Sequence, residues 1–367
     1  MLNKKYRDEA VLLKKEKIPE NTKIVAWEAP SNIALIKYWG KKGNQLPLTP
    51  SLSMTLSNSN TRTEIHFKKA EGENGIISFL FNGEPEHPFV KKVKKYIRRI
   101  EPYFPFLRDM DLYIISRNTF PHSAGLASSA SAMSSLALCI CSIETMINKE
   151  EYSKERFFQK ASYIARIGSG SASRSVYGNF VEWGRHTFGA DEFAYPSSVK
   201  IHNTLNFIYD SILIISSEEK SVSSSKGHSL MKHHPYKEAR IKQATENLDK
   251  IRKALREGDF ESFAETTENE ALTLHALMLS SKPGYILLKD QTISIIEKIR
   301  NNRKKNKTKI TFTLDAGPNV HVLYPLSEKD VARDFIEKEL KMHCENGKII
   351  HDFIGQGPEQ VDKKDDS

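Results

Sequence analysis

The order of strand-like and helix-like segments is the feature that most constrains the fold of this 367-residue chain. Short runs typical of strands are mixed with longer amphipathic or apolar runs typical of helices, and the two kinds do not alternate strictly. This order predicts an α+β protein. The expected strands span 24–29, 33–39, 61–67, 76–83, 111–118, 205–216, a hairpin at 309–326 and a short run at about 349–355, and the expected helices span 89–100, 130–147, 153–167, 236–257, 259–280, 291–303 and 328–342.

The sequence also predicts a turn and the boundaries between domains. Pro30, Ser31 and Asn32 separate the first two expected strands and predict a turn there. The length suits two domains, and the character of the sequence changes near residue 205, where long amphipathic helices begin to dominate. We therefore expect a charged N-terminal extension (1–23), a first domain (24–204), a second domain (205–358) and a polar tail (359–367).

Composition excludes several classes of protein. Hydrophobic residues make up 39% and charged residues 28% of the chain, which is typical of a folded globular protein rather than a disordered one. No stretch approaches the roughly 20 apolar residues of a membrane span, and the charged N-terminus does not resemble a secretory signal. The three cysteines form no disulfide framework, and Cys139 and Cys141 lie in an apolar run where buried thiols are expected. These features predict a cytoplasmic protein that does not bind a membrane.

The formal net charge of +9 is concentrated in two basic runs, 91–99 and 303–309. In the first run, apolar residues fall on one helical face, so the lysines are interpreted as a solvated opposite face. No aromatic-interleaved strand pattern of an RNA-binding sheet and no zinc-finger spacing accompanies them. His228, His233 and His234 lack nearby metal-ligand partners and are interpreted as solvated rather than as a metal site. The basicity suits a phosphorylated small-molecule substrate.

A serine-rich segment, 121–135, precedes the expected apolar helix. Gly125 permits a tight turn, and serine hydroxyls lie beside the unpaired N–H groups of a helix start, which is a ready site for anions. The segment lacks the Walker pattern G-x-x-x-x-G-K-[ST]. It predicts either a phosphate-binding loop or an ordinary serine-rich helix cap.

Three further segments carry candidate chemistry. Arg174 lies among the small residues of 165–183 and can clamp a carboxylate or phosphate with two hydrogen bonds, or be a surface residue on a flexible turn. Asp315 leads a Gly-Pro-Asn turn and can be a turn-former or a base for a substrate hydroxyl. Lys37 shares a strand face with apolar residues, which predicts a charged partner, although a strand-end surface lysine is the alternative.

Taken together and in this order, these segments resemble the mevalonate diphosphate decarboxylases of the GHMP kinase superfamily. The resemblance covers nearly the whole chain beyond residue 23. It rests on the strings APSNIALIKYWGKK, LPLTPSLSMTL, FPHSAGLASSAS, GSGSASRSVYGNFVEW, LHALMLSSKPGY, TLDAGPNVHVL and GQGP.

The resemblance implies a fold, a reaction and partners. The first domain is expected to resemble ribosomal protein S5 domain 2, and the second to be ferredoxin-like, with the active site between them. ATP and Mg²⁺ are the implied cofactors, phosphorylated mevalonate is the implied substrate, and a homodimer is the family's usual form. The implied enzyme phosphorylates the tertiary hydroxyl and then releases phosphate and carbon dioxide to give isopentenyl diphosphate.

The resemblance also assigns roles to residues. Asp315 accepts or orients the proton of the 3-hydroxyl, Lys37 is its candidate neighbour, and Arg174 holds the substrate carboxylate. The other substrate-binding residues are Asn32, Tyr38, Trp39, Gly40, Lys41, Ser169, Gly170, Ser171, Ala172 and Ser173. The expected ATP-binding residues are Ser123, Ala124, Gly125, Leu126, Ala127, Ser128, Ser129 and Ser131. No protein ligand of a metal is assigned.

Two departures from the family pattern concern the phosphate end of the substrate. Glu84 and Ser225 stand where many members carry arginine. His122, His228, His233 or Lys226 are candidate replacements. The alternatives left open are a decarboxylase of mevalonate 5-phosphate, a mevalonate 3-kinase and, from another class, a basic nucleic-acid-binding protein.

Overall fold

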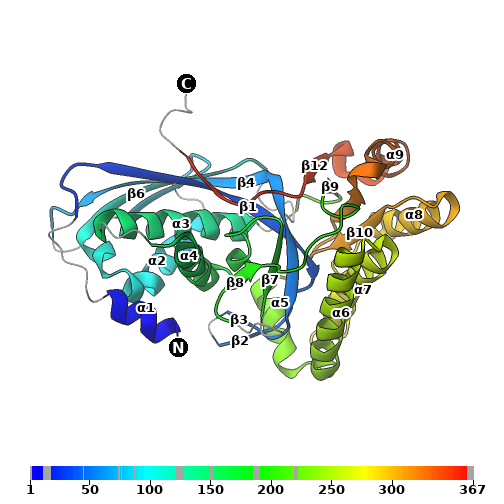
Figure 1. The fold of residues 1–367 in the computed structure, drawn as a ribbon, viewed down its shortest axis with the longest axis horizontal. Helices are drawn as coiled ribbons and strands as arrows, with labels where there is room; N and C mark the ends of the chain where they lie inside the picture. Colours follow the sequence, from blue (N-terminus) through cyan, green and yellow to red (C-terminus); the bar gives the residue numbers. More distant parts are fainter. Residues whose placement is uncertain are drawn as a thin grey trace.

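A computed structural model gives the fold shown in Figure 1. It describes residues 2–10, 18–43, 45–72, 75, 77–85, 88–120, 128–148, 152–184, 191–218 and 222–361. Mixed sheets and helices confirm the expected α+β class.

The N-terminal half is built on a seven-stranded sheet with the order β13-β1-β4-β6-β5, to which β7 is added through β4 and β8 through β7. All of these strand pairs are antiparallel except β5 with β6. A separate two-stranded ribbon, β2 (Lys41–Lys42) with β3 (Leu46–Pro47), follows β1. The sheet strands are β1 (Lys23–Ile36), β4 (Ser51–Lys69), β5 (Ile77–Phe81), β6 (Met110–Asn118), β7 (Phe180–Trp183), β8 (Ala194–Pro196) and β13 (Glu359–Gln360).

The turn predicted at Pro30 is wrong, because β1 runs through it. Strand β1 pairs with β4 on both sides of this point, with register shifts between Pro30 and Asn32 and between Ala34 and Ile36. Irregularities of this kind accommodate a proline, which has no N–H to donate to the ladder. The second predicted strand also ends early, since β1 stops at Ile36 and Lys37 leaves the sheet.

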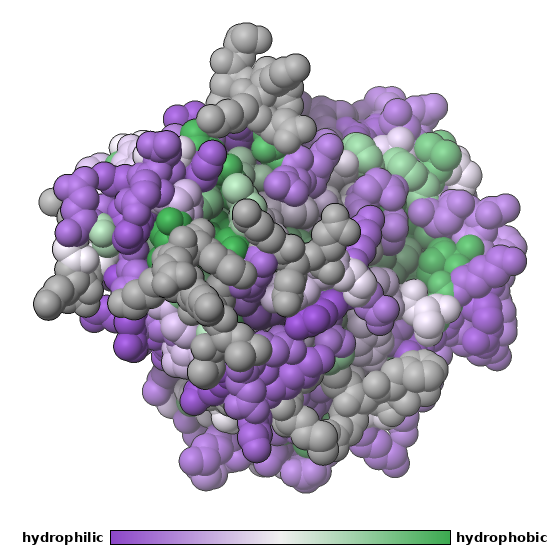
Figure 2. All heavy atoms as spheres, turned by 60° about the vertical axis from the view of Figure 1, so that its left-hand side comes forward, coloured by the Kyte–Doolittle hydropathy of each residue, from purple (hydrophilic) through white to green (hydrophobic). Residues whose placement is uncertain are grey.

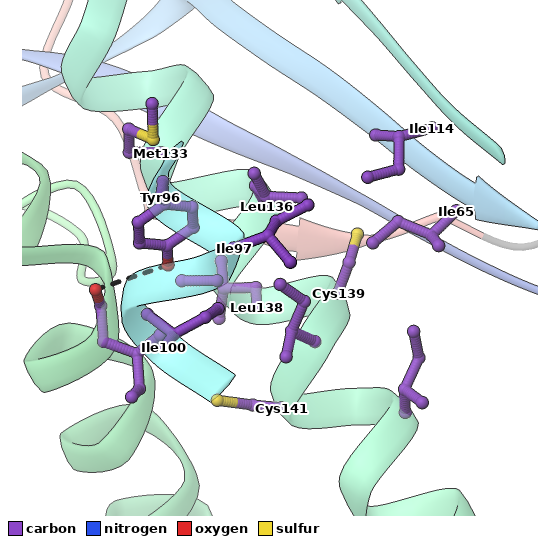
Figure 3. Close-up of a cluster of buried hydrophobic side chains, with 14 of the residues drawn as sticks. Ile65, Tyr96, Ile97, Ile100, Ile114, Met133, Leu136, Leu138, Cys139 and Cys141 are labelled. Atoms are coloured by element: carbon purple, nitrogen blue, oxygen red, sulfur yellow. Dashed lines mark hydrogen bonds between the residues drawn. The ribbon is translucent and has the colours of Figure 1, made fainter. Parts of the chain in front are cut away.

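Helices α2 (Pro88–Ile100), α3 (Ser128–Asn148) and α4 (Lys154–Gly168) cover one face of this sheet (Figure 1). The apolar side of α2 is buried as expected, and α3 lies at the centre of the core (Figure 3). Cys139 and Cys141 are free and buried, as predicted, and burial raises the pKa of both thiols. Figure 3 also shows Tyr96, whose hydroxyl donates to the carbonyl of Ile164 at 3.3 Å.

Helix α3 has the length and hydropathy of a membrane span, contrary to the expectation from the sequence. Within the protein, however, 89% of its apolar window is buried, so it is placed as a core helix. The face of the molecule in Figure 2 is mostly hydrophilic, with smaller apolar areas. The N-terminal extension contributes α1 (Leu2–Ala10), whose Tyr6 is buried against Tyr163 of α4.

The C-terminal half is a four-stranded antiparallel sheet with the order β10-β11-β9-β12. Helices α6 and α7 form a hairpin: Gly258 ends α6 at φ 73°, and the Asp259 side chain caps α7 by accepting from the Ser262 N–H. The remaining elements include α8 and α9. The bounds are β9 (Ile208–Leu213), β10 (Thr311–Leu314), β11 (Val320–Pro325), β12 (Ile349–Phe353), α5 (Ser224–Leu230), α6 (Lys237–Glu257), α7 (Phe260–Leu279), α8 (Asp290–Asn306) and α9 (Lys329–Phe335).

The two halves are joined at the end of the chain. Asp352 of β12 accepts hydrogen bonds from the backbone N–H groups of Ser57, Asn58 and Ser59 in β4. The chain then crosses to the first sheet, where β13 pairs with β1. The two halves are thus held together by the Asp352 side chain and by the pairing of β13 with β1.

Candidate active site

A cavity of about 490 Å³ lies where the two halves meet. It is lined from the N-terminal half by the end of β1 and the segment after it, by α2, by the start of α3 and by the loop after α4. From the C-terminal half it is lined by α5, α7 and the turn between β10 and β11. The predicted residues among its lining are Asn32, Lys37, Tyr38, Trp39, Lys41, Ser128, Ser129, Ser169, Gly170, Ser171, Arg174 and Asp315.

Lys37 and Asp315 form an ion pair across the two halves. Lys37 Nζ lies 3.1 Å from Asp315 Oδ1, which confirms that they are neighbours. The lysine side chain is 2% exposed and the aspartate side chain 30% exposed. Burial lowers the pKa of Lys37, and the Asp315 carboxylate opposes this effect. The His275 ring lies 3.1 Å from the Asp315 carbonyl oxygen through its Nε2, so α7 helps to place the turn.

A second buried ion pair holds the backbone of Lys37. Arg240 of α6 and Glu270 of α7 make two hydrogen bonds, of 2.7 and 2.6 Å. Glu270 Oε2 also accepts the Lys37 N–H at 2.8 Å, and Arg240 donates to the Lys37 carbonyl at 3.1 Å. The point at which the chain leaves β1 is therefore held on both sides by charged groups, which the sequence analysis did not identify.

Arg174 is a buried cation at the wall of the cavity. Its Nε donates to Asn32 Oδ1 at 3.3 Å and its Nη1 donates to Ser51 Oγ at 2.8 Å. The guanidinium also lies near the rings of Tyr38 and Trp183. Burial lowers the pKa of Arg174 to about 10, while the charge of Asp315 acts in the opposite direction. These neutral contacts fix the orientation of the guanidinium group.

A group of aromatic and basic side chains lines another part of the cavity. Tyr38 and Trp39 lie on either side of His228, whose Nδ1 accepts the Gly40 N–H at 3.1 Å. Lys41 Nζ donates to Gln45 Oε1 at 2.8 Å. Burial, followed by the charge of Arg99, lowers the pKa of Lys41. Lys41 is therefore the cation of this group, and the assignment of the group to the phosphate end of the substrate stays a prediction.

The structure divides the predicted serine-rich residues into two sets. Ser129 Oγ lies 3.3 Å from Ser169 Oγ, so the start of α3 and the loop after α4 meet at the cavity. Ser131 instead faces the sheet, where its hydroxyl lies 2.6 Å from Thr61 Oγ1. Ala172 and Ser173 are buried behind the lining, and Ser173 Oγ donates to the Gly170 carbonyl. Ser123, Ala124, Gly125, Leu126 and Ala127 fall outside the described residues.

Several lining residues were missed by the sequence analysis. Lys92 belongs to the basic face of α2, which was interpreted as solvated; its side chain is exposed, in agreement with that interpretation, and it also lines the cavity. His234, also interpreted as solvated, is buried, and its Nε2 lies 3.0 Å from the Leu277 carbonyl. The remaining lining residues that were missed are Ala34, Gln45, Phe89, Gly168, Ser223, Ser224, Leu274 and Ala316. Ser225 and His228 also line the cavity, and both had been named in the sequence analysis in connection with the phosphate end of the substrate.

Two family models match the chain. The diphosphomevalonate decarboxylase-like N-terminal domain matches residues 29–194, and the mevalonate 5-diphosphate decarboxylase C-terminal domain matches residues 211–363. The diphosphomevalonate decarboxylase of Saccharomyces cerevisiae is 33% identical over 82% of this chain and 78% of its own length. That of Candida albicans is 31% identical over 91% of this chain and 96% of its own.

Solved structures show the same similarity. Mevalonate diphosphate decarboxylase from Staphylococcus aureus superposes with a TM-score of 0.79 at 30% identity, over 94% of this chain and 99% of the other. A structure of MDDEF in complex with MVAPP, AMPPCP and magnesium superposes with a TM-score of 0.78 at 28% identity, over 94% of this chain and 100% of the other.

Proposed function

Because the chain belongs to the diphosphomevalonate decarboxylase family and has its GHMP kinase fold, we propose that it catalyses the ATP-dependent decarboxylation of mevalonate 5-diphosphate to isopentenyl diphosphate. The cavity supports this proposal, since it places a carboxylate, a buried lysine and a buried arginine on one substrate-sized space.

The single observation that carries the proposal is the state of Arg174. Its guanidinium is buried, and among the residues that the structure describes no carboxylate lies within ion-pair distance of it. A buried charge without a counter-ion is costly, so such a group is expected to receive an anion when the site is filled. A substrate carboxylate bound by Arg174 meets this need and lies next to the Lys37–Asp315 pair.

We propose a task for each charged group. Asp315 accepts the proton of the 3-hydroxyl as that oxygen bonds to the γ-phosphorus of ATP and the bond to the ADP oxygen breaks. Lys37 favours the ionised form of Asp315 through its charge. Arg174 then holds the substrate carboxylate until the bond between C1 and C2 breaks. Those two electrons form the C2–C3 double bond, phosphate leaves C3 with the C–O electrons, and carbon dioxide is released.

The residues present fit a nucleotide with Mg²⁺. Ser128 and Ser129 start α3 at the cavity, where N–H groups and hydroxyls would hold phosphates. The described residues contain no group of three or more His, Cys, Asp or Glu side chains that could hold a metal ion. When bound, Mg²⁺ would be held mainly by the nucleotide phosphates. The ion would neutralise charge on the transferred phosphoryl group.

The test is to measure ADP and carbon dioxide release with ATP, Mg²⁺ and, separately, mevalonate, mevalonate 5-phosphate and mevalonate 5-diphosphate. We expect equal amounts of the two products, with the diphosphate as the best substrate. Products formed only with the monophosphate would contradict the proposal and indicate a mevalonate 5-phosphate decarboxylase. ADP released without carbon dioxide would also contradict it and indicate a mevalonate 3-kinase.

We further propose that the protein is a cytoplasmic homodimer. All three cysteines are free and buried, which suits a reducing compartment. Light scattering of the purified protein measures the oligomeric state, and fractionation of the native cells measures the location. A monomer at working concentration, or recovery outside the cytoplasm, would contradict this assignment.

A further inference from the structure

His228 reaches the cavity from α5, in the C-terminal half, 188 positions along the chain from the Gly40 amide that it binds. Its ring centroid lies 4.4 Å from that of Tyr38 and 4.6 Å from that of Trp39. The ring is therefore held between two aromatic side chains, with Nδ1 turned toward the backbone of Gly40.

Two glycines make this close approach possible. A Cβ at Gly227 would lie 2.5 Å from the Tyr285 hydroxyl and 2.6 Å from the Trp39 ring, so α5 can approach Trp39 only with glycine at this position. Gly40 has φ 86°, and a Cβ there would lie 2.7 Å from the Leu48 side chain. The position of the Gly40 N–H, and with it the orientation of the His228 ring, is thus set by packing.

The protonation state of the ring follows from these surroundings. Burial in the cleft, followed by the charges of Lys41 and Arg174, lowers the pKa of His228 to about 3. The ring is therefore neutral at neutral pH. Since Nδ1 accepts the Gly40 N–H, the single ring hydrogen is on Nε2. Among the residues that the structure describes, none accepts a hydrogen bond from this Nε2–H.

We propose that His228 donates its Nε2–H to an oxygen of the 5-phosphate end of the mevalonate substrate and so helps to select phosphorylated mevalonate. This inference rests on the proposed function, because it places that substrate in the cavity. Lys41 supplies the charge in this region, whereas the neutral imidazole supplies a directed donor that recognises a phosphate oxygen at a fixed position. An apolar substrate end would leave this donor buried and unpaired.

Two variants separate this binding role from a structural one. In His228→Asn, the side-chain oxygen can still accept the Gly40 N–H, but the distal donor is lost. In His228→Gln, the longer side chain can return an N–H donor to the position of Nε2. We expect His228→Asn to raise KM for mevalonate 5-diphosphate at least about tenfold, as for loss of one hydrogen bond to a charged group. His228→Gln should stay within about threefold of wild type.

Binding of mevalonate 5-diphosphate without ATP, measured by titration calorimetry, gives a readout independent of turnover, and KM for ATP and thermal stability serve as controls. A near-normal KM in His228→Asn with a raised KM in His228→Gln would overturn the proposal and leave His228 as a support for Gly40. If wild type turns over mevalonate 5-diphosphate, this result contradicts only the inference. If wild type neither binds nor converts it, the proposed function itself is wrong.

Discussion

Two buried lysine–carboxylate pairs in this protein have the same chemistry and different surroundings. In the pair between α3 and α4, Lys160 Nζ lies 2.7 Å from both oxygens of Glu144, and both side chains are 2% exposed. The Tyr6 and Phe104 rings lie over the amine at 5.4 and 4.9 Å. In the pair at the cavity, Lys37 reaches one oxygen of Asp315, and the aspartate remains 30% exposed.

The difference in exposure of the two carboxylates indicates that the Lys160–Glu144 pair is structural and that the Lys37–Asp315 pair is able to react. Glu144 uses both oxygens on one lysine and is sealed by aromatic rings, so no substrate can reach it. Asp315 keeps a surface on the cavity, where a hydroxyl can approach it. Removing one partner from an enclosed pair leaves an uncompensated buried charge, whereas water or a ligand can reach an open pair. We therefore expect substitutions in the enclosed pair to lower stability and substitutions in the open pair to lower activity.

Asp315→Asn gives the largest expected effect on activity. The amide keeps the shape of the carboxylate but cannot accept the hydroxyl proton, so turnover should fall by about 10²- to 10⁴-fold while substrate binding persists. The matched control is Glu144→Gln in the enclosed pair, which should lower thermal stability and leave turnover of the folded protein nearly unchanged. Steady-state rates and melting curves for both variants measure this contrast. Near-normal turnover in Asp315→Asn would remove Asp315 from its assigned task.

Replacement of the lysines tests the same contrast from the other side. Lys160→Met should lower the free energy of unfolding by about 3–5 kcal/mol, because Glu144 is left buried without a partner. Lys37→Met should cost less stability, since Asp315 is accessible to water, but should lower kcat. Urea denaturation and initial rates distinguish these outcomes. If Lys160→Met and Lys37→Met lost the same free energy of unfolding and had the same kcat, the burial of the carboxylate would not distinguish the roles of the two pairs.

Arg174→Lys should reduce kcat/KM at least about tenfold, since lysine cannot reproduce a two-bond clamp on a carboxylate. Arg108→Lys is a suitable control, because Arg108 is exposed and paired with Glu101 away from the cavity. An unchanged kcat/KM in Arg174→Lys would place this residue outside substrate recognition.

The smallest expected effect is on the pH profile. Burial lowers the pKa of Lys37 from 10.5, with Asp315 opposing the shift, and only the protonated amine forms the pair. The pair is therefore complete below the folded-state pKa and is lost as pH rises through it. We expect the alkaline limb of activity to lie below the ordinary lysine value and to move upward in Lys37→Arg, since arginine stays charged. If the pH at which activity falls on the alkaline side were the same in Lys37→Arg as in wild type, the fall would be due to another titrating group.

Long periodic segments were the most predictable part of the fold. Helices α3, α4, α6 and α7 begin and end within two residues of the sequence-based prediction, because each carries one sustained apolar pattern. The turn at Pro30 was predicted wrongly, since its outcome depends on whether β4 is long enough to pair on both sides of it. A local signal cannot report the length of a partner strand.

Sequence alone determined the family, the α+β class and most of the residues that meet at the cavity, because these depend on residue types and their order along the chain. Only the tertiary structure brought Arg240 and Glu270 to the Lys37 backbone, placed Lys92 on the cavity and set His228 between two aromatic rings. The physical reason is that these contacts join residues far apart in the chain. Their neighbours are selected by how the two halves pack, and no local pattern in either segment records that packing.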